Sequence, residues 1–360
     1  MKIAHFIDSG GLYGAEKMLL TLCKEQIKQG LDPLIVSCGV PNEGPKAIEL
    51  ACYAAGISCL AWRMSAGLNI KGFKLLLETL QEKKIDIFHS HGYKFNILFC
   101  FLELRGLKSK KITTIHGYIP RKPFTKGWLY QALDRIAVKT FDHIVYVNDI
   151  DKIKNSPRSR SRSTIYNGIE FNSESNTQKK DIKYKIAYFG RLSEEKGANL
   201  LPKALLIVNK KIQAISLDIY GEGPDYEFIS KEINATGLSP RITLKGYTNN
   251  VTKEFKNYDL IVMPSKSEGL PMISLEAINS NTPIICTRVG GLPNLLGQDY
   301  PYFISHPPSP ENIANSIINF YVNGFEISRN ITKALKIKAA RNYSSSTMSS
   351  EYTAIYKKIS

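Results

Sequence analysis

Short apolar runs alternate with amphipathic stretches along the first half of this chain. Residues 2–7 (KIAHFI) form an apolar run, and residues 14–30 then carry apolar side chains at helical spacing before a closing glycine: Met18, Leu19, Leu22, Cys23. Such a pattern predicts a strand followed by a helix. The alternation continues with strands predicted at 32–39, 85–91, 110–117 and 142–149, and helices at 73–84 and 96–106.

The same alternation repeats in the second half, after a polar stretch without periodicity at residues 171–183. Strands are predicted at 184–192, 215–223, 241–247, 259–265 and 282–291, and helices at 199–211, 225–237, 251–258 and 271–280. Strands that alternate with helices predict parallel sheets covered on both faces. Two such halves joined once imply a cleft between them, with ligands at the carboxyl ends of the strands.

Length and composition agree with two domains. The chain has 360 residues, of which 43% are hydrophobic, enough for about two cores. No apolar run reaches the roughly 18 to 20 residues of a membrane helix, and the N-terminus is too short in apolar residues for a signal peptide. The six cysteines contain no C-x-x-C pair, which favours reduced thiols. We therefore expect a cytoplasmic protein.

The net charge of +16 is uneven, because residues 1–165 hold 25 Lys/Arg and 14 Asp/Glu, or +11, and the remainder holds 23 and 18, or +5. Basic clusters lie at 105–111, 122–126 and 156–163. Such clusters suit anionic lipid, phosphorylated ligands or nucleic acid, or are simply solvated surface. No aromatic RNA-binding signature or zinc-finger spacing accompanies them, so nucleic acid is not expected as a partner.

A glycine-rich turn follows the first strand, and two cations follow the first strand of the second half. Gly11 and Gly14 lie where backbone N–H groups can approach an anion, although a tight turn needs glycine in any case. Arg191 and Lys196 come after the apolar run 184–189. The planar guanidinium of Arg191 and the compact charge of Lys196, both after a strand's carboxyl end, suit a diphosphate.

The stretch SEGLPMISLEA, residues 267–277, places two acids eight positions apart around Gly-Leu-Pro. Pro271 suits the first helical position, which puts Glu268 in a loop and Glu276 about one turn into a helix. Loop amides and the helix's positive end favour an anion, while the carboxylates accept hydrogen bonds from hydroxyls. An anion flanked by polyols is typical of a nucleotide sugar.

These motifs resemble glycosyltransferase family 4, whose fold is GT-B: two Rossmann-like, doubly wound α/β domains that face a central cleft. The matching stretches run from the N-terminus to about residue 356: GGLYGAEKML, TTIHG, YNGIE, FGRLSEEKG, YGEGP, LKGY, PSKSEGLPMISLEA and TRVGGLPNLL. The resemblance implies an acceptor-binding domain at 1–170, a linker at 171–183, a donor-binding domain at 184–342 and a C-terminal helix within 343–360 that returns to the first domain.

The resemblance also implies roles for individual residues. Glu268 would contact donor-sugar hydroxyls, Glu276 the ribose, and Arg191 and Lys196 the departing diphosphate, while His116 would face the reacting centre. The catalytic set is therefore His116, Arg191, Lys196 and Glu268. The remaining donor-binding residues would be Gly11, Gly14, Gly190, Gly221, Gly223, Gly246, Tyr247, Gly269, Leu270, Pro271 and Glu276. Tyr352 and Tyr356 would lie on the last helix.

The family resemblance further implies a retaining transfer from a nucleotide sugar, UDP-linked by preference, to a glycan or lipid-linked acceptor in cell-surface polysaccharide synthesis. We expect no metal and no other cofactor. His89 and His91 share one face of a strand end, but two ligands without a third are weak support for a metal site. Asp149 to Asp151 match D-x-D, for which helix capping is the better account.

Alternatives remain open at this point. A nucleotide-sugar isomerase (epimerase) of the same fold would convert the donor without an acceptor. A dinucleotide oxidoreductase would need a ribose-binding acid after the second strand, which this chain lacks. A non-catalytic subunit would not need the intact motifs. Peripheral binding to the inner face of the plasma membrane would give the basic clusters a role.

Overall fold

The chain folds into two compact units, the first comprising residues 1–170 and 343–360 and the second residues 171–342. The computed structural model describes residues 1–103, 110–117, 123–149, 161–172, 182–248 and 250–360. Most of the basic clusters at 105–111 and 156–163, the end of the D-x-D match and the middle of the expected linker lie outside these residues.

The described part of the first unit contains a seven-stranded parallel sheet in the order β3-β2-β1-β4-β5-β6-β7. Its strands are β1 (Lys2–Ile7), β2 (Asp32–Gly39), β3 (Ser58–Arg63), β4 (Ile87–Ser90), β5 (Lys111–Ile115), β6 (His143–Tyr146) and β7 (Ser161–Thr164). Its helices are α1 (Gly14–Lys28), α2 (Ala47–Ala55), α3 (Ile70–Gln81), α4 (Tyr93–Glu103), α5 (Lys126–Ala137), the short η1 (Val138–Thr140) and α14 (Ser345–Ile359).

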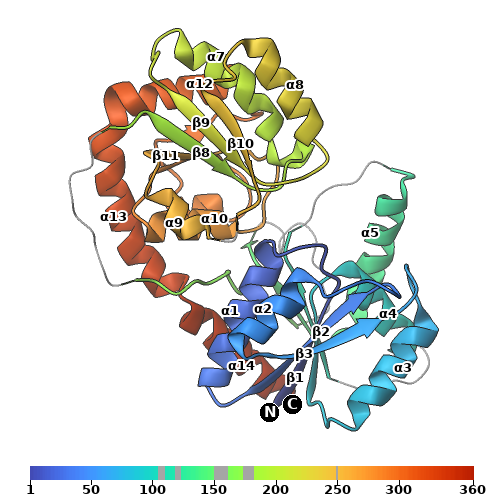
Figure 1. The fold of residues 1–360 in the computed structure, drawn as a ribbon. Helices are drawn as coiled ribbons and strands as arrows, with labels where there is room; N and C mark the ends of the chain where they lie inside the picture. The colour runs from blue at the N-terminus through green and yellow to red at the C-terminus, as the bar shows by residue number, and fades with distance from the viewer. Residues whose placement is uncertain (104–109, 118–122, 150–160, 173–181, 249) are drawn as a thin grey trace. The chain divides into compact units, whose positions relative to one another are not determined.

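Helices cover both faces of this sheet, which is why its central strands are apolar on both sides. In Figure 1, α1 and α14 lie on one side of the sheet and α3 and α4 on the other. Buried aromatic rings fill the side under α3 and α4: Phe6, Phe73, Phe88, Phe95 and Phe99. Side chains of α1 and α2 form a smaller cluster on the opposite face with Ile7 and Ile35.

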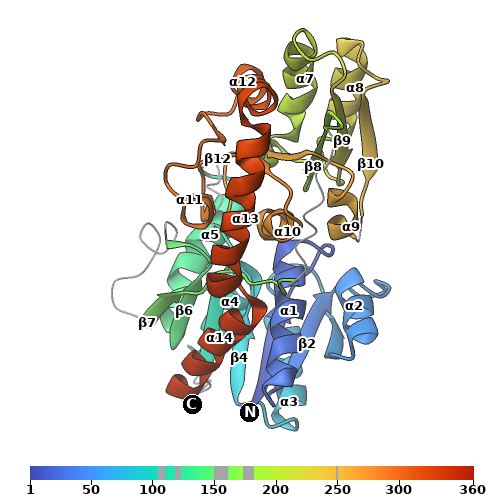
Figure 2. The same cartoon turned by 90° about the vertical axis from the view of Figure 1, so that its left-hand side faces the viewer.

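The helix α14 lies beside α1 (Figure 2) and completes the second face of the sheet. Ser344 caps its start by accepting a hydrogen bond from the Thr347 amide at 3.1 Å. Tyr352 and Tyr356 are buried on it, as the resemblance implied for the last helix, and both hydroxyls bond to groups of the first unit. Burial of two tyrosines therefore fixes α14 to the sheet.

The second unit has a six-stranded parallel sheet among its described residues, in the order β10-β9-β8-β11-β12-β13. The strands are β8 (Lys185–Phe189), β9 (Ser216–Tyr220), β10 (Ile242–Gly246), β11 (Leu260–Met263), β12 (Ile284–Thr287) and β13 (Phe303–Ile304). The helical segments are η2 (Glu194–Lys196), η3 (Ala198–Leu200), α7 (Leu201–Asn209), α8 (Tyr226–Thr236), α9 (Val251–Phe255), α10 (Met272–Asn279), α11 (Leu292–Leu296), α12 (Pro310–Asn319), η4 (Phe320–Gly324) and α13 (Phe325–Asn342).

The predicted class, α/β with parallel sheets, is confirmed. One local prediction was wrong: Pro271 is not the first helical residue but the N-cap of α10, with φ −70° and ψ 126°. With its extended ψ, Pro271 stays outside the helix, which therefore begins at Met272, one residue later than expected. The pattern also gave no sign of β7, because Ser and Arg alternate there without an apolar face.

We expect Phe99→Ala to lower the free energy of unfolding of the first unit by about 3–5 kcal/mol, because it leaves a cavity in a close-packed core. The Phe99 ring lies 4.9 Å from that of Phe73 and 5.1 Å from that of Phe6. Both tryptophans, Trp62 and Trp128, lie in this unit, so tryptophan fluorescence during urea unfolding reports on it.

The matched control is Phe101→Ala, because Phe101 lies on the same helix with 37% of its surface exposed. We expect a loss of less than about 1 kcal/mol there. Equal losses in the two variants would contradict the assignment of the aromatic cluster as the core of this unit.

Candidate active site

The strands of the second sheet bring most of the predicted residues to one edge. Gly190 follows β8, Gly221 follows β9 and Gly246 ends β10, and the carboxyl ends of parallel strands meet at a single edge. Two backbone bonds join these ends: the Gly190 amide donates to the Tyr220 carbonyl at 3.1 Å and the Gly221 amide to the Gly246 carbonyl at 2.8 Å. Tyr247, directly after β10, is exposed there.

Gly221 and Gly223 are glycines for a steric reason that the sequence did not reveal. With φ at +136° and +157°, both adopt backbone conformations that other residues rarely take. A Cβ on Gly221 would lie 1.8 Å from the Gly190 carbonyl oxygen, and one on Gly223 would lie 2.2 Å from that of Leu192. The turn after β9 therefore packs backbone against backbone with the turn after β8.

Lys196 and Glu268, predicted separately, contact each other directly. The Lys196 Nζ lies 2.7 Å from the Glu268 Oε2, and the Ser265 hydroxyl donates to Oε1 at 2.6 Å. The Glu268 side chain is only 6% exposed, while that of Lys196 is 28% exposed. Both carboxylate oxygens of Glu268 thus accept hydrogen bonds, and the cation retains access to solvent.

Several polar groups around this pair were missed by the sequence analysis. The Thr287 hydroxyl donates to the Ser265 carbonyl, which fixes the loop that carries Glu268. Tyr188 is buried and donates to the Arg191 carbonyl at 2.9 Å. Burial first, and then the nearby charge of Glu268, raise the pKa of Tyr188 well above its usual value. Ser265 and Thr287 both lie at the ends of apolar strands, a position that could have marked them.

Arg191 itself is exposed, and its side chain forms no ion pair within the described part of the chain. Its position follows from Gly190 and from the bond between its carbonyl and Tyr188. An exposed guanidinium keeps its N–H donors available for a ligand.

The loop from Glu268 to Pro271 packs on the turn that follows β12. The Gly291 amide donates to the Gly269 carbonyl at 2.6 Å, and a Cβ on Gly290 would lie 2.2 Å from the Glu268 carbonyl oxygen. The Leu270 side chain is 3% exposed, so this residue can offer a ligand only its backbone. Half-buried Glu276 lies on the first turns of α10.

In the first unit, Gly11 and Gly14 lie where β1 passes into α1. The Ser9 hydroxyl donates to the Gly11 carbonyl at 2.7 Å, and a Cβ on Gly11 would lie 2.6 Å from the Tyr13 ring. Gly14 is the first residue of α1. The turn is therefore held by its own contacts, which explains Gly11 before any ligand is considered.

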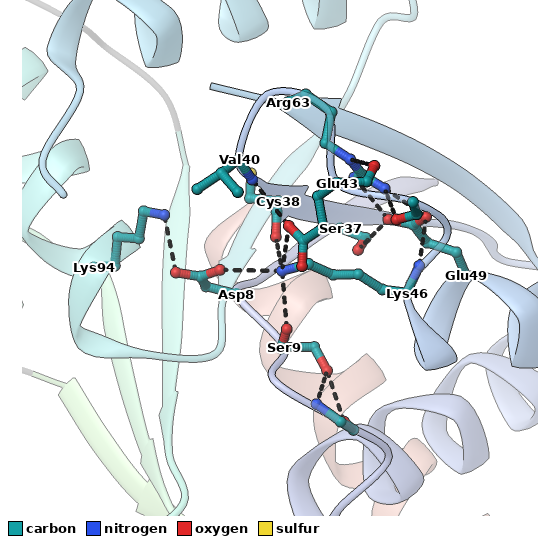
Figure 3. A network of polar contacts seen from close by, with 12 residues as sticks. Asp8, Ser9, Ser37, Cys38, Val40, Glu43, Lys46, Glu49, Arg63 and Lys94 are labelled. Carbon is teal, nitrogen blue, oxygen red and sulfur yellow. Dashed lines mark hydrogen bonds and ion pairs between the residues drawn. The ribbon is translucent and has the colours of Figure 1, made fainter. Parts of the chain in front are cut away.

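Lys46 anchors this turn, although no motif in the sequence marked it. Figure 3 shows its amine between Asp8 and the carbonyl groups of Ser9 and Cys38. Nζ donates to the Ser9 carbonyl at 2.9 Å and to that of Cys38, and lies 3.6 Å from Asp8 Oδ1. Lys94 pairs with the other oxygen of Asp8 at 2.9 Å. Buried charge thus ties the ends of β1 and β2 together.

His116 directly follows β5, as the motif predicted, and is half-buried. Its Nε2 lies 3.1 Å from Nδ1 of His91. Burial lowers the pKa of His116 to about 4. The ring is consequently neutral at pH 7.

His5 supplies the third histidine that the sequence analysis found lacking. Ring nitrogens of His5, His89 and His91 lie within 4.8 Å of one another. However, both nitrogens of each ring have hydrogen-bond partners: a neighbouring histidine, Gln26, Thr114 or Tyr356. The parallel register sets His5 opposite His89, a pairing that was invisible because β1 and β4 are distant in sequence. These bonds account for the three rings as a packed, hydrogen-bonded cluster.

Two family models match the chain and together span residues 13–338. Glycosyltransferase Family 4 matches residues 13–171, and Glycosyl transferases group 1 matches residues 169–338. The chain belongs to glycosyltransferase family 4.

Similar proteins carry related names. Poly(glycerol-phosphate) alpha-glucosyltransferase of Bacillus subtilis is 38% identical over 29% of this chain and 15% of its own length. UDP-Gal:alpha-D-GlcNAc-diphosphoundecaprenol alpha-1,3-galactosyltransferase of Escherichia coli is 24% identical over 74% of this chain and 78% of its own. The crystal structure of Anabaena HepE with UDP-glucose superposes with a TM-score of 0.83, at 17% identity over 99% and 100% of the two chains. The fold is therefore GT-B.

We expect Glu268→Ala to lower the rate of sugar transfer by at least about 10²–10³-fold, because it removes a preorganised acceptor and leaves Lys196 without its partner. The assay is release of UDP from UDP-glucose and other UDP-hexoses. Glu194→Ala is the control, since Glu194 lies in η2, two residues before Lys196, but its side chain is 80% exposed. Retained turnover in Glu268→Ala would contradict the site assignment.

Proposed function

We propose that this chain transfers a sugar, with retention of anomeric configuration, from a UDP-sugar to a glycan or lipid-linked acceptor in cell-surface polysaccharide synthesis. The observation that carries the proposal is the Lys196–Glu268 pair of 2.7 Å, set beside the start of α10 at the carboxyl edge of the second sheet. A cation, a carboxylate and the N-terminal amides of a helix at one point suit a diphosphate joined to a polyol.

The names of similar proteins support the donor and acceptor classes. UDP-glucose is bound in the HepE structure, and the galactosyltransferase is named for a UDP-sugar and a diphosphoundecaprenol acceptor. The glucosyltransferase is named for poly(glycerol-phosphate). Taken together, these names support a UDP-sugar donor and a polymeric or lipid-linked acceptor.

In the proposed chemistry, residues of the second unit stabilise the negative charge of the leaving group. When the bond between the anomeric carbon and the diphosphate oxygen breaks, negative charge develops on that oxygen. Lys196, Arg191 and the α10 amides stabilise this charge. Glu268 accepts hydrogen bonds from sugar hydroxyls and Glu276 from the ribose.

No protein nucleophile is required in this scheme. The acceptor oxygen attacks the anomeric carbon from the side that the diphosphate leaves, and the departing phosphate oxygen takes the acceptor's proton. Glu268 is poorly suited to attack, because Lys196 and Ser265 already bond to its two oxygens. The two-carboxylate arrangement of retaining glycosidases is a different constellation.

We also propose that the reaction needs no metal ion. Two cationic side chains and a helix N-terminus provide the positive charge that a divalent cation supplies in other phosphoryl-leaving reactions. The isomerase alternative gains no support from the similar proteins, whose names all denote transferases or synthases where they state a function.

For the membrane, the structure corrects one part of the basic surface. Lys111 was expected to meet headgroups, but it is 1% exposed, pairs with Glu103 and lies over the Phe141 ring. The described region around α5 offers a better surface: Phe124 is 94% exposed, Trp128 and Leu129 are exposed, and Lys126 lies among them. None of the described helices is long and apolar enough to span a bilayer. We propose peripheral binding to anionic membranes through this apolar and basic surface.

A thermal-shift panel with UDP, GDP, ADP and NAD tests the donor. We expect a selective rise with UDP, since binding adds RT ln(1 + [L]/Kd), or about 2.7 kcal/mol at 100 Kd. Excess chelator should leave both the shift and the transfer rate unchanged, and their loss would contradict the metal-free scheme. A shift with NAD alone would favour an oxidoreductase and overturn the proposal.

Vesicle co-sedimentation tests the membrane proposal. We expect binding to vesicles that contain phosphatidylglycerol, weakening as salt rises, and little binding to neutral vesicles. Phe124→Ser should reduce binding several-fold, whereas Val322→Ser, at a position 67% exposed in the second unit, should not. Binding that ignores lipid charge and salt would contradict this role for the α5 surface.

A further inference from the structure

A chain of hydrogen bonds runs from Gln26 through three imidazole rings on one face of the first sheet. The Gln26 Oε1 lies 3.0 Å from His5 Nε2, and His5 Nδ1 lies 3.0 Å from His91 Nε2. His91 Nδ1 then lies 3.1 Å from His116 Nε2. Gln26, His5 and His91 are buried, while His116 is half-buried at the carboxyl end of β5.

Each neutral imidazole in such a chain has one N–H and one lone pair. A ring that accepts a hydrogen bond at one nitrogen therefore donates a hydrogen bond from the other. An amide oxygen only accepts, so His5 donates from Nε2 and accepts at Nδ1. His91 therefore donates from Nε2 and accepts at Nδ1. His116 in turn donates from Nε2, which leaves a lone pair on its Nδ1.

A second branch sets the orientation of the Gln26 amide. Its nitrogen lies 3.4 Å from the Tyr356 hydroxyl, which lies 2.7 Å from His89 Nδ1. A separation of 3.4 Å suits a weak N–H donor but is long for an O–H to a carbonyl oxygen, whose usual distance is about 2.7–2.8 Å. The tyrosine hydroxyl therefore donates to His89, and His89 Nε2 donates to Thr114 at 2.8 Å.

His116 Nδ1 has no hydrogen-bond partner within the described residues. It follows β5, at the edge of the sheet where ligands of parallel α/β folds bind. Burial lowers the pKa values of all four rings in the cluster. The rings must be neutral for the direction of one hydrogen bond to set the direction of the next.

We propose that Gln26, His5 and His91 are positioning residues that hold His116 in the Nε2–H tautomer, so that its Nδ1 accepts a hydrogen bond from a substrate hydroxyl. A lone pair at this point attracts the O–H groups of a sugar and disfavours phosphate or carboxylate oxygens, which can only accept. The identity of the ligand as a sugar rests on the proposed function. The tautomer of His116 does not depend on the proposed function.

This arrangement also limits His116 as a base. If Nδ1 took a proton and Nε2 passed one along the chain, the last proton would have to move from His5 to the amide oxygen of Gln26, which does not accept it under ordinary conditions. His116 is therefore a fixed hydrogen-bond acceptor rather than a proton relay. A phosphate oxygen as the proton acceptor of the transfer step is consistent with that role.

Nitrogen-15 NMR of imidazole-labelled protein without ligand tests the proposal directly, because it distinguishes Nε2–H from Nδ1–H rings. The chain has six histidines, and His116→Gln assigns the signal of His116. We expect the Nε2–H tautomer in the wild type. An Nδ1–H tautomer of His116 would overturn the proposal, whatever the protein's activity.

Two substitutions of matched size test the anchor. Gln26→Glu keeps an acceptor for His5, so with His5 neutral, a state that the same spectrum reports, His116 should remain the Nε2–H tautomer. Gln26→Met removes the acceptor, so an Nδ1–H population should appear at His116. An unchanged tautomer in a folded Gln26→Met variant would overturn the role of Gln26, and if that variant fails to fold, the wild-type spectrum still decides the direction of the chain.

Kinetics then links the tautomer to the reaction. With UDP-hexose donors, Gln26→Met should lower kcat/KM about tenfold, the worth of roughly one hydrogen bond, and Gln26→Glu should retain most of it. Equal losses in both variants would show that the chain does not act through bond direction. If no UDP-sugar is turned over, the proposed function fails while the NMR result stands.

Discussion

Parallel pairing is the constraint on which the rest of this protein depends. Every described strand in both sheets runs parallel to its neighbours, so each needs a long crossover and brings its carboxyl end to the same edge. Helices then cover both faces, and apolar residues fill the strands. The price is a crowded edge, where turns such as that of Gly221 pass within van der Waals contact of the next turn.

The edge of the second sheet shows which features of this protein the sequence could predict and which it could not. The alternation of runs was enough for the fold class and for most strands and helices. The motif around Glu268 also marked the start of α10 to within one residue. Contacts between elements were another matter: Lys196 and Glu268 are 72 residues apart, and nothing in their spacing indicated an ion pair. The positions of strands and helices could be predicted from the sequence pattern, whereas the partner of each side chain depends on the order of the strands in the sheet.

The histidines illustrate the same limit. His89 and His91 were visible as a pair, but His5 joins them only because β1 pairs with β4, where His5 lies opposite His89 although the two are 84 positions apart in the sequence. The cations show a related effect. Lys46 and Lys111 count toward the net charge of +16, yet both are largely buried and serve to join strand ends or pair with acids. Composition therefore overstates the charge available to a partner.

The position of α14 bears on how this protein is made. Its tyrosines complete the hydrogen bonds of His89 and Thr114 in the sheet of the first unit, although the intervening residues 171–342 form another unit. During synthesis from the N-terminus, residues 1–170 emerge long before residues 345–359. The unit that the ribosome delivers first is thus the last to acquire its full set of buried partners, and the second unit can fold while the first still waits.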